Sequence, residues 1–214
     1  MGGLRKLAAL EPAALFLSIM GYIWVWRHSH PYLWVAILAC LLASHVLRGE
    51  RARELGFGRE SLSECARRFA PLLAFLSLLM IAAGLLLNTT RRMPTDQAFL
   101  ALFAYLPWGI LQQYMLNGYF LRRFDRALPP HDSAWLTAAL FALVHTPNWF
   151  LMIVGLLGGW CAIKVYRRHP NLYFLGIAHA TIGFLLFVTV PDSINHHLEI
   201  GPGMLRPHVH HAIQ

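Results

Sequence analysis

Residues 98–121 read AFLALFAYLPWGILQQYMLNGYFL, a run of 24 residues without a charged side chain. A helix needs about 20 mostly apolar residues to cross a bilayer, so this run is long enough to span one. Six further apolar runs occur in the chain, and prolines or arginines separate them. We therefore predict an all-α, polytopic membrane helix bundle with about seven transmembrane helices, at 12–26, 32–47, 69–88, 98–121, 133–145, 148–166 and 172–190.

The composition favours lipid as the solvent for this chain. Of its 214 residues, 57% are hydrophobic and only 13% are charged, against about 25% charged in an average soluble domain. Seven spans with short loops use nearly the whole length, so we expect a single membrane domain over residues 1–214 and no separate soluble domain.

The formal charge of +8 does not indicate a nucleic-acid partner, because the basic residues lie between apolar runs and form no stripe with aromatic residues. With seven spans, 14 of the 18 Lys and Arg residues fall on one side of the membrane and 4 on the other. Loops rich in Lys and Arg stay cytoplasmic. We therefore expect an integral membrane protein, of the bacterial inner (cytoplasmic) membrane, with a cytoplasmic N-terminus and an outside C-terminus.

The loop at residues 48–68 alternates basic residues with Leu55, Phe57 and Leu62. This pattern is compatible with a short helix that lies on the lipid headgroups. A solvated basic loop fits equally well, and the two interpretations stay open here.

Five of the polar residues inside the predicted spans stand out, because apolar side chains are the rule there. Helical rise places Gln112 about 15 Å from the inner surface, His145 about 20 Å and His179 about 12 Å. Gln113 and Asn117 are four residues apart and share a helix face. Such residues also act as hydrogen-bonding links between helices, worth about 1 kcal/mol each. Their common depth on three spans favours one functional cavity, lined by Gln112, Gln113, Asn117, His145 and His179.

Three short motifs resemble those of the CAAX protease and bacteriocin-processing (CPBP) family of intramembrane endopeptidases, of the type II CAAX prenyl protease kind. The family's Glu-Glu-x-x-x-Arg followed by Gly corresponds to residues 112–118, Gln-Gln-Tyr-Met-Leu-Asn-Gly. Its Phe-x-x-x-His is matched by Phe141 and His145. Its His-x-x-x-Asn/Asp is matched by His179 but not by Gly183. The resemblance covers a CPBP-like core at about 98–190.

The resemblance implies an intramembrane endopeptidase that hydrolyses peptide bonds of a membrane-associated peptide or protein, with membrane lipid as its other partner. In the family, a first-motif glutamate activates water, and the histidines and the terminal Asn bind the water and the oxyanion. Gln112 and Gln113 have no basic site near neutral pH, so a histidine must replace the glutamate. We expect His145 or His179 to be the base, with Gln112, Gln113 and Asn117 as oxyanion donors.

A catalytically inert relative that binds a peptide or lipid in the same cavity is the alternative. A small transporter is disfavoured, because no carboxylate lies within the spans apart from Glu11 near the inner edge of the first span. No cofactor and no metal is expected, since two histidines with neutral amides make a weak metal site. The histidines near the C-terminus are interpreted as incidental surface residues: His196, His197, His208, His210 and His211.

Overall fold

The computed structural model describes residues 2–205, except for the side chains of residues 2–8. His208, His210 and His211 therefore lie outside the described residues. Within the described part the chain is helical and forms no strand. Seven helices of 14 residues or more make up the bundle: α1 (Gly2–Gly21), α2 (Leu33–Leu47), α3 (Leu62–Leu86), α4 (Thr95–Gln113), α6 (Pro130–Leu143), α7 (Trp149–Arg168) and α8 (Leu172–Thr189).

Shorter elements extend or connect these helices. Two π-helical segments and a short helix prolong the long ones: η1 (Tyr22–Trp26) follows α1, while η3 (Tyr114–Leu121) and α5 (Arg122–Ala127) continue α4. A third π-helical turn, η2 (Arg53–Phe57), precedes α3. The chain ends with α9 (Asp192–Asn195) and two 3₁₀ turns, η4 (His196–Leu198) and η5 (Gly201–Leu205).

The helices confirm the predicted all-α membrane bundle. Among the described residues, five are long and apolar enough to cross a membrane: Ala9–Trp26, Arg53–Leu86, Thr95–Ala127, Trp149–Arg168 and Leu172–Thr189. Helix α2 is a shorter apolar helix, and α6 has 14 residues. The chain is therefore an integral membrane protein.

Two predicted helix starts are wrong: α3 begins at Leu62 and not at residue 69, and Pro12 does not mark the start of α1. The first helix begins at Gly2 and contains Pro12 in its interior. Pro71 and Pro107 likewise lie inside α3 and α4. Membrane helices tolerate internal proline, because neighbouring groups satisfy the backbone carbonyl that loses its partner.

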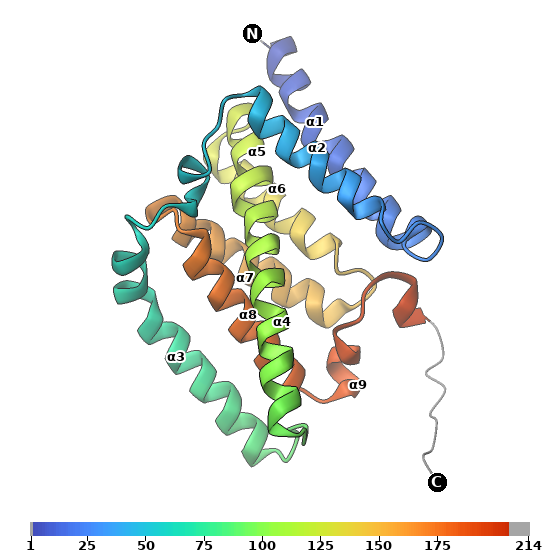
Figure 1. The fold of residues 1–214 in the computed structure, drawn as a ribbon, viewed down its shortest axis with the longest axis vertical. Coiled ribbons are helices and arrows are strands. Elements are labelled where there is room, and N and C mark those ends of the chain that lie inside the picture. Colours follow the sequence, from blue (N-terminus) through green and yellow to red (C-terminus); the bar gives the residue numbers. More distant parts are fainter. Residues whose placement is uncertain (1, 206–214) are drawn as a thin grey trace.

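The bundle is built around α4. Figure 1 shows α1 and α2 side by side at one edge of the bundle, α3 at the opposite edge, and α4 between them. Helix α4 packs most extensively against α8, and α6 packs against α7. This arrangement brings together the three helices that carry the predicted site residues.

Two glycines let α4 and α8 approach backbone to backbone. A Cβ atom built on Gly109 would lie 2.5 Å from the carbonyl oxygen of Gly176. A Cβ atom on Gly176 would lie 2.7 Å from the Cα of Ile110. Small residues of this kind allow close helix packing in membranes. Gln113 follows Gly109 by one turn and His179 follows Gly176 by one turn, so the close contact sets these two side chains against each other.

Buried asparagines fix the starts of α7 and α8. The side-chain oxygen of Asn148 accepts from the backbone N–H of Leu151 at 3.1 Å, and that of Asn171 accepts from Phe174 at 2.8 Å. Each is an N-cap that satisfies an otherwise unpaired donor. Asn148 also donates to the carbonyl of Asn195 at 2.9 Å, so the segment after α8 is tied to the loop that carries His145.

Part of the loop at 48–68 forms a helical turn, η2, that packs against the bundle. Leu55 in η2 is buried, and the hydroxyl of Tyr166 donates to its carbonyl at 2.9 Å. Gly56 has a φ of 99°, a conformation that glycine adopts without strain. Leu55 and Gly56 therefore belong to the packed core at the basic end of the bundle, whereas Arg51, Arg53 and Arg59 of the same loop are exposed.

Candidate active site

A chain of three hydrogen-bonded side chains crosses the contact between α4 and α8. Asn117 donates from Nδ2 to Oε1 of Gln113 at 2.8 Å. The Nε2 of Gln113 lies 3.2 Å from Nδ1 of His179. Because the amide oxygen of Gln113 is taken by Asn117, its amide nitrogen faces the imidazole and donates to it. Neutral His179 therefore carries its proton on Nε2.

Asn117 reaches this position from a π-helical segment. It lies in η3, which follows Gln113 without a break, and it is fully buried. π-Helical turns within α-helices are uncommon and occur frequently at functional sites. Here the segment holds Asn117 one turn beyond Gln113, within hydrogen-bonding distance.

His145 has the opposite tautomer from His179. It follows the C-terminal end of α6, and its Nδ1 lies 2.7 Å from the backbone carbonyl of Phe141. A carbonyl oxygen only accepts, so Nδ1 carries the proton and Nε2 of the neutral ring has a free lone pair. Gly155 of α7 provides the space, since a Cβ there would lie 3.3 Å from Nδ1. His145 therefore presents a basic nitrogen, and His179 presents a donor.

The ring of Phe141 lies between the two imidazoles. Its centroid is 5.1 Å from that of His145 and 6.0 Å from that of His179, and both contacts are edge to face. Phe141 in turn packs against α7 at Gly159, where a Cβ would lie 3.1 Å from the ring. Phe141 thus contacts both histidines, and Gln113 and Asn117 join them through the hydrogen bond between Gln113 and His179.

Gln112 is not hydrogen-bonded to the other four. Its Oε1 is buried without a hydrogen-bond partner, as is Oδ1 of Asn117.

Gly183 stands where the family's third motif has Asn or Asp. Gly183 faces Tyr105, and a Cβ there would lie 3.3 Å from the Tyr105 ring. Tyr105, which occupies the space beside Gly183, could not be found from any motif in the sequence.

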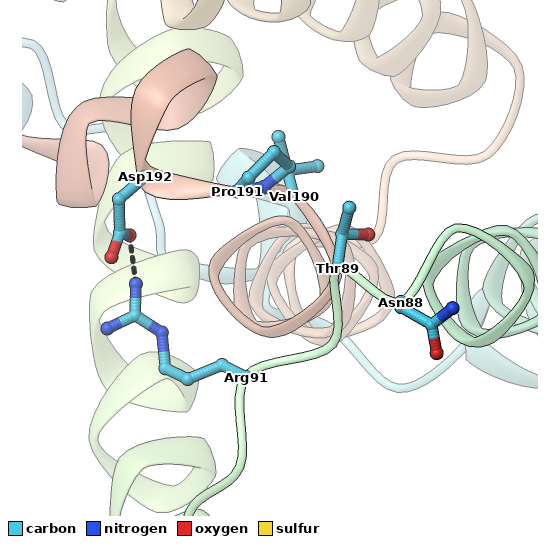
Figure 2. Close-up of a pocket in the computed structure, with 6 residues that line it drawn as sticks. All are labelled: Asn88, Thr89, Arg91, Val190, Pro191 and Asp192. Carbon is cyan, nitrogen blue, oxygen red and sulfur yellow. Dashed lines mark hydrogen bonds and ion pairs between the residues drawn. The ribbon is translucent and has the colours of Figure 1, made fainter.

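A pocket of ≈ 320 Å³ lies away from this cluster, between the α3–α4 connection and the end of α8. Figure 2 shows its lining, where Arg91 forms an ion pair with Asp192. The guanidinium of Arg91 also lies 4.1 Å from the ring centroid of Phe187. None of the five predicted site residues lines this pocket. Among residues 2–205, no group of three or more His, Cys, Asp or Glu side chains is placed to hold a metal ion.

The sequence analysis missed a charged network at the basic end of the bundle. Glu50 accepts from Arg123 at 2.8 and 3.1 Å, from Nδ1 of His45 at 2.6 Å, and from Arg126. Glu11 accepts from Tyr119 at 2.8 Å and also bonds Ser44 and Arg48. We refer to this set as the Glu50 network; it comprises Glu11, Ser44, His45, Arg48, Glu50, Tyr119, Arg123 and Arg126.

Arg123 corrects the interpretation of the basic residues as surface charges. Its side chain is only 1% exposed, and that of Glu50 is 5% exposed. Arg123 is one of the 14 basic residues on the predicted cytoplasmic side, yet its side chain lies inside the bundle, where Glu50 and Glu11 offer it two carboxylates. The sequence feature that could have indicated this buried ion pair is Glu11, a carboxylate near the edge of the first span.

The charges around Glu50 control its ionisation. Burial alone would raise the pKa of Glu50, but hydrogen bonds from Arg123 and His45, with the charges of Arg123 and Arg126, outweigh burial. The pKa of this carboxyl therefore lies well below its usual range. Glu50 is therefore ionised near neutral pH.

The family comparison agrees with the resemblance found in the motifs. Residues 94–185 match the family model described as type II CAAX prenyl endopeptidase Rce1-like. The matched segment contains all five predicted site residues and Phe141. The resemblance to CAAX-processing intramembrane proteases is thereby confirmed over this segment. No curated protein and no solved structure matches the chain.

Proposed function

We propose that the protein is an intramembrane endopeptidase of the CAAX-processing type, which hydrolyses a peptide bond of a membrane-associated peptide or protein. The observation that carries the proposal is the opposite tautomers of the two partly buried histidines. A general base and an oxyanion donor are the two groups that peptide hydrolysis requires. The family match over residues 94–185 supports the same reaction.

In this mechanism His145 is the general base. Its Nε2 takes a proton from water, and the water oxygen attacks the scissile carbonyl carbon. The Nε2–H of His179 donates to the developing oxyanion, and Gln113 holds the His179 ring through Nδ1. The protonated His145 then returns its proton to the leaving amine, so that one water is consumed and two peptide ends are released.

The experiment is cleavage of a peptide library by the purified protein in detergent. We expect His145→Ala and His179→Ala each to lose cleavage by about 10²- to 10⁴-fold, the usual contribution of a general acid or base. His131→Ala is the matched control, because His131 is exposed at the start of α6. Cleavage that survives both substitutions in a well-folded protein would exclude this mechanism.

An inert relative that binds a peptide or lipid is the second candidate function. The observation in its favour is that Gln112 and Asn117 each keep a buried oxygen without a partner, which a bound N–H group could satisfy. The triple variant Gln112→Glu, Gln113→Glu, Asn117→Arg separates the two. If the glutamines only replaced a catalytic carboxylate, the variant should gain activity over the wild type. If the wild type is inactive and the triple variant folds but is also inactive, the protein is a binding protein.

We also propose that the basic end of the bundle faces the cytoplasm of a bacterial inner membrane, so that the C-terminus lies outside. The support is the 14 to 4 distribution of Lys and Arg. Reporter fusions after Arg126 and after Gln214 should therefore report opposite sides. Fusions that report the same side would contradict the seven-span arrangement.

A further inference from the structure

A second cavity, of ≈ 520 Å³, lies between α2, η2 and the start of η3, and Tyr114 alone of its lining residues lies within the matched segment 94–185. Most of its wall is apolar: Leu38, Leu42, Val46, Leu55 and Phe57. Its size falls in the range of about 300–1,000 Å³ that small-molecule sites occupy. It is separate from the candidate active site, since none of the five predicted site residues lines it.

The cavity is apolar at one end and polar at the other. On α2 its lining runs from Leu38 to Val46, about 12 Å at the rise of a helix. Leu38 is the deep end, whereas His45 and Glu50 lie beside Arg48 at the basic end of the bundle. A lipid has the same polarity, with its chain toward the bilayer centre and its head toward the surface.

Two buried residues of the wall each have a polar atom without a hydrogen-bond partner. These are Nε2 of His45 and the hydroxyl of Tyr114. The residues are 4% and 5% exposed, and their ring centroids are 5.7 Å apart. Buried polar groups are nearly always hydrogen-bonded in native proteins, so this adjacent pair indicates a missing partner.

The protonation of His45 defines what that partner must be. Its Nδ1 lies 2.6 Å from Oε2 of Glu50 and 3.1 Å from Nη2 of Arg123. The carboxylate is the nearer group and can only accept, so the ring proton lies on Nδ1. Nε2 of the neutral ring is then an acceptor, and the Tyr114 hydroxyl beside it is a donor. A hydroxyl group satisfies both, because it can donate to Nε2 and accept from Tyr114. A carboxylate satisfies only Tyr114, and it would lie near the charge of Glu50.

We propose that this cavity binds a neutral lipid with one acyl chain and a hydroxylated head group, with the chain against α2 and a hydroxyl between His45 and Tyr114. The lipid comes from the surrounding membrane and has the chemistry of a monoacylglycerol. The site is independent of the proposed peptidase activity, because it shares no residue with the histidine cluster.

The test uses the full-length protein in detergent and 1-monooleoylglycerol that carries a photoreactive group in its chain. We expect cross-links on the segments that contain Leu38–Val46 and Leu55–Phe57, and competition by unlabelled 1-monooleoylglycerol at lower concentration than by oleate. Cross-links spread evenly over all lipid-facing helices would show annular lipid only and would overturn the proposal.

Three variants make the result specific. Leu42→Trp should fill the cavity and abolish saturable cross-linking, whereas Leu79→Trp, at a similarly exposed leucine of α3, should leave it unchanged. Tyr114→Phe removes only the hydroxyl and should weaken binding about three- to tenfold, the effect of one neutral hydrogen bond. Folded Tyr114→Phe or Leu42→Trp that binds 1-monooleoylglycerol as tightly as the wild type would contradict the assigned site. So would a wild type that binds oleate and 1-monooleoylglycerol equally.

Discussion

The Glu50 network and the histidine cluster are both buried and polar, but only the first is charged. The network at the basic end contains Glu50 and Arg123, with side chains 5% and 1% exposed. The cluster between α4, α6 and α8 consists of neutral amides and imidazoles. Burying an ion costs far more than burying a neutral group that is hydrogen-bonded. The charged groups therefore need several partners each, whereas the neutral cluster holds together with single hydrogen bonds.

The difference also explains how each region is stabilised. The Glu50 network joins segments that are far apart in the chain through ion pairs near the loops. The histidine cluster depends on close packing at Gly109 and Gly176 and on the ring of Phe141. Charge should therefore dominate the stability of the first region, and shape that of the second.

The largest expected effect is the loss of Glu50. Glu50→Ala leaves the buried guanidinium of Arg123 without its main partner, and breaking such a pair costs about 3–5 kcal/mol. Denaturant unfolding in detergent measures this free energy. Glu60→Ala is the control, since Glu60 pairs with Arg53 in an exposed position and its loss should cost at most about 1 kcal/mol. Equal losses in the two variants would contradict the comparison.

Acid should weaken the charged region selectively. The folded-state pKa of Glu50 lies below its ordinary value of 4.5, so its contribution to stability is complete above that pH. The contribution is lost progressively as the pH falls below 4.5 toward the folded-state pKa. Unfolding free energies measured between about pH 6 and pH 3 should fall less steeply for Glu50→Gln than for the wild type. Parallel profiles would show that another carboxyl governs the acid response.

Packing at the histidine cluster is tested by a pair of glycine substitutions. Gly176→Ala places a Cβ 2.7 Å from the Cα of Ile110, and such overpacking costs about 1–3 kcal/mol. Gly158→Ala on α7 meets nothing within 4 Å and should be neutral or slightly stabilising. Thermal unfolding of the two variants measures the difference. A neutral Gly176→Ala would mean that α4 and α8 are not in backbone contact.

The smallest expected effect concerns a hydrogen bond within the neutral cluster. Gln113→Leu removes the bonds to Asn117 and His179, and interhelical hydrogen bonds in membranes average about 0.6 kcal/mol. A double-mutant cycle with His179→Ala should give a coupling energy of this order. A coupling energy of several kcal/mol would mean that the neutral cluster is as strongly coupled as the charged network, which would contradict the comparison.

The helices could be predicted from the sequence because a bilayer leaves few alternatives. Backbone groups in hydrocarbon must be hydrogen-bonded within their own segment, so each long apolar run has to be a helix. The run at 98–121 shows this, although the helix continues to Ala127. Pro12 did not mark the start of the first helix, because a membrane helix tolerates an internal proline when neighbouring groups satisfy the freed backbone carbonyl.

The five site residues were singled out by sequence for a related reason. Gln113, Asn117 and His179 are conspicuous in apolar spans, and their mutual hydrogen bonds are consistent with that reading. The sequence could not assign the tautomers of His145 and His179, because these depend on which atom each Nδ1 faces. It also could not show that Gln112 is hydrogen-bonded to none of the other four, or that Tyr105 lies at Gly183.

By itself, therefore, the sequence determined the helices, the membrane as solvent, and the neutral polar residues that need partners inside it. Only the tertiary structure decided the partners. Glu50 and Arg123 are 73 residues apart in the chain, and each is ordinary as a loop residue next to a membrane span. Hydropathy follows from local composition, whereas a buried ion pair forms only when folding brings two distant charges to the same place.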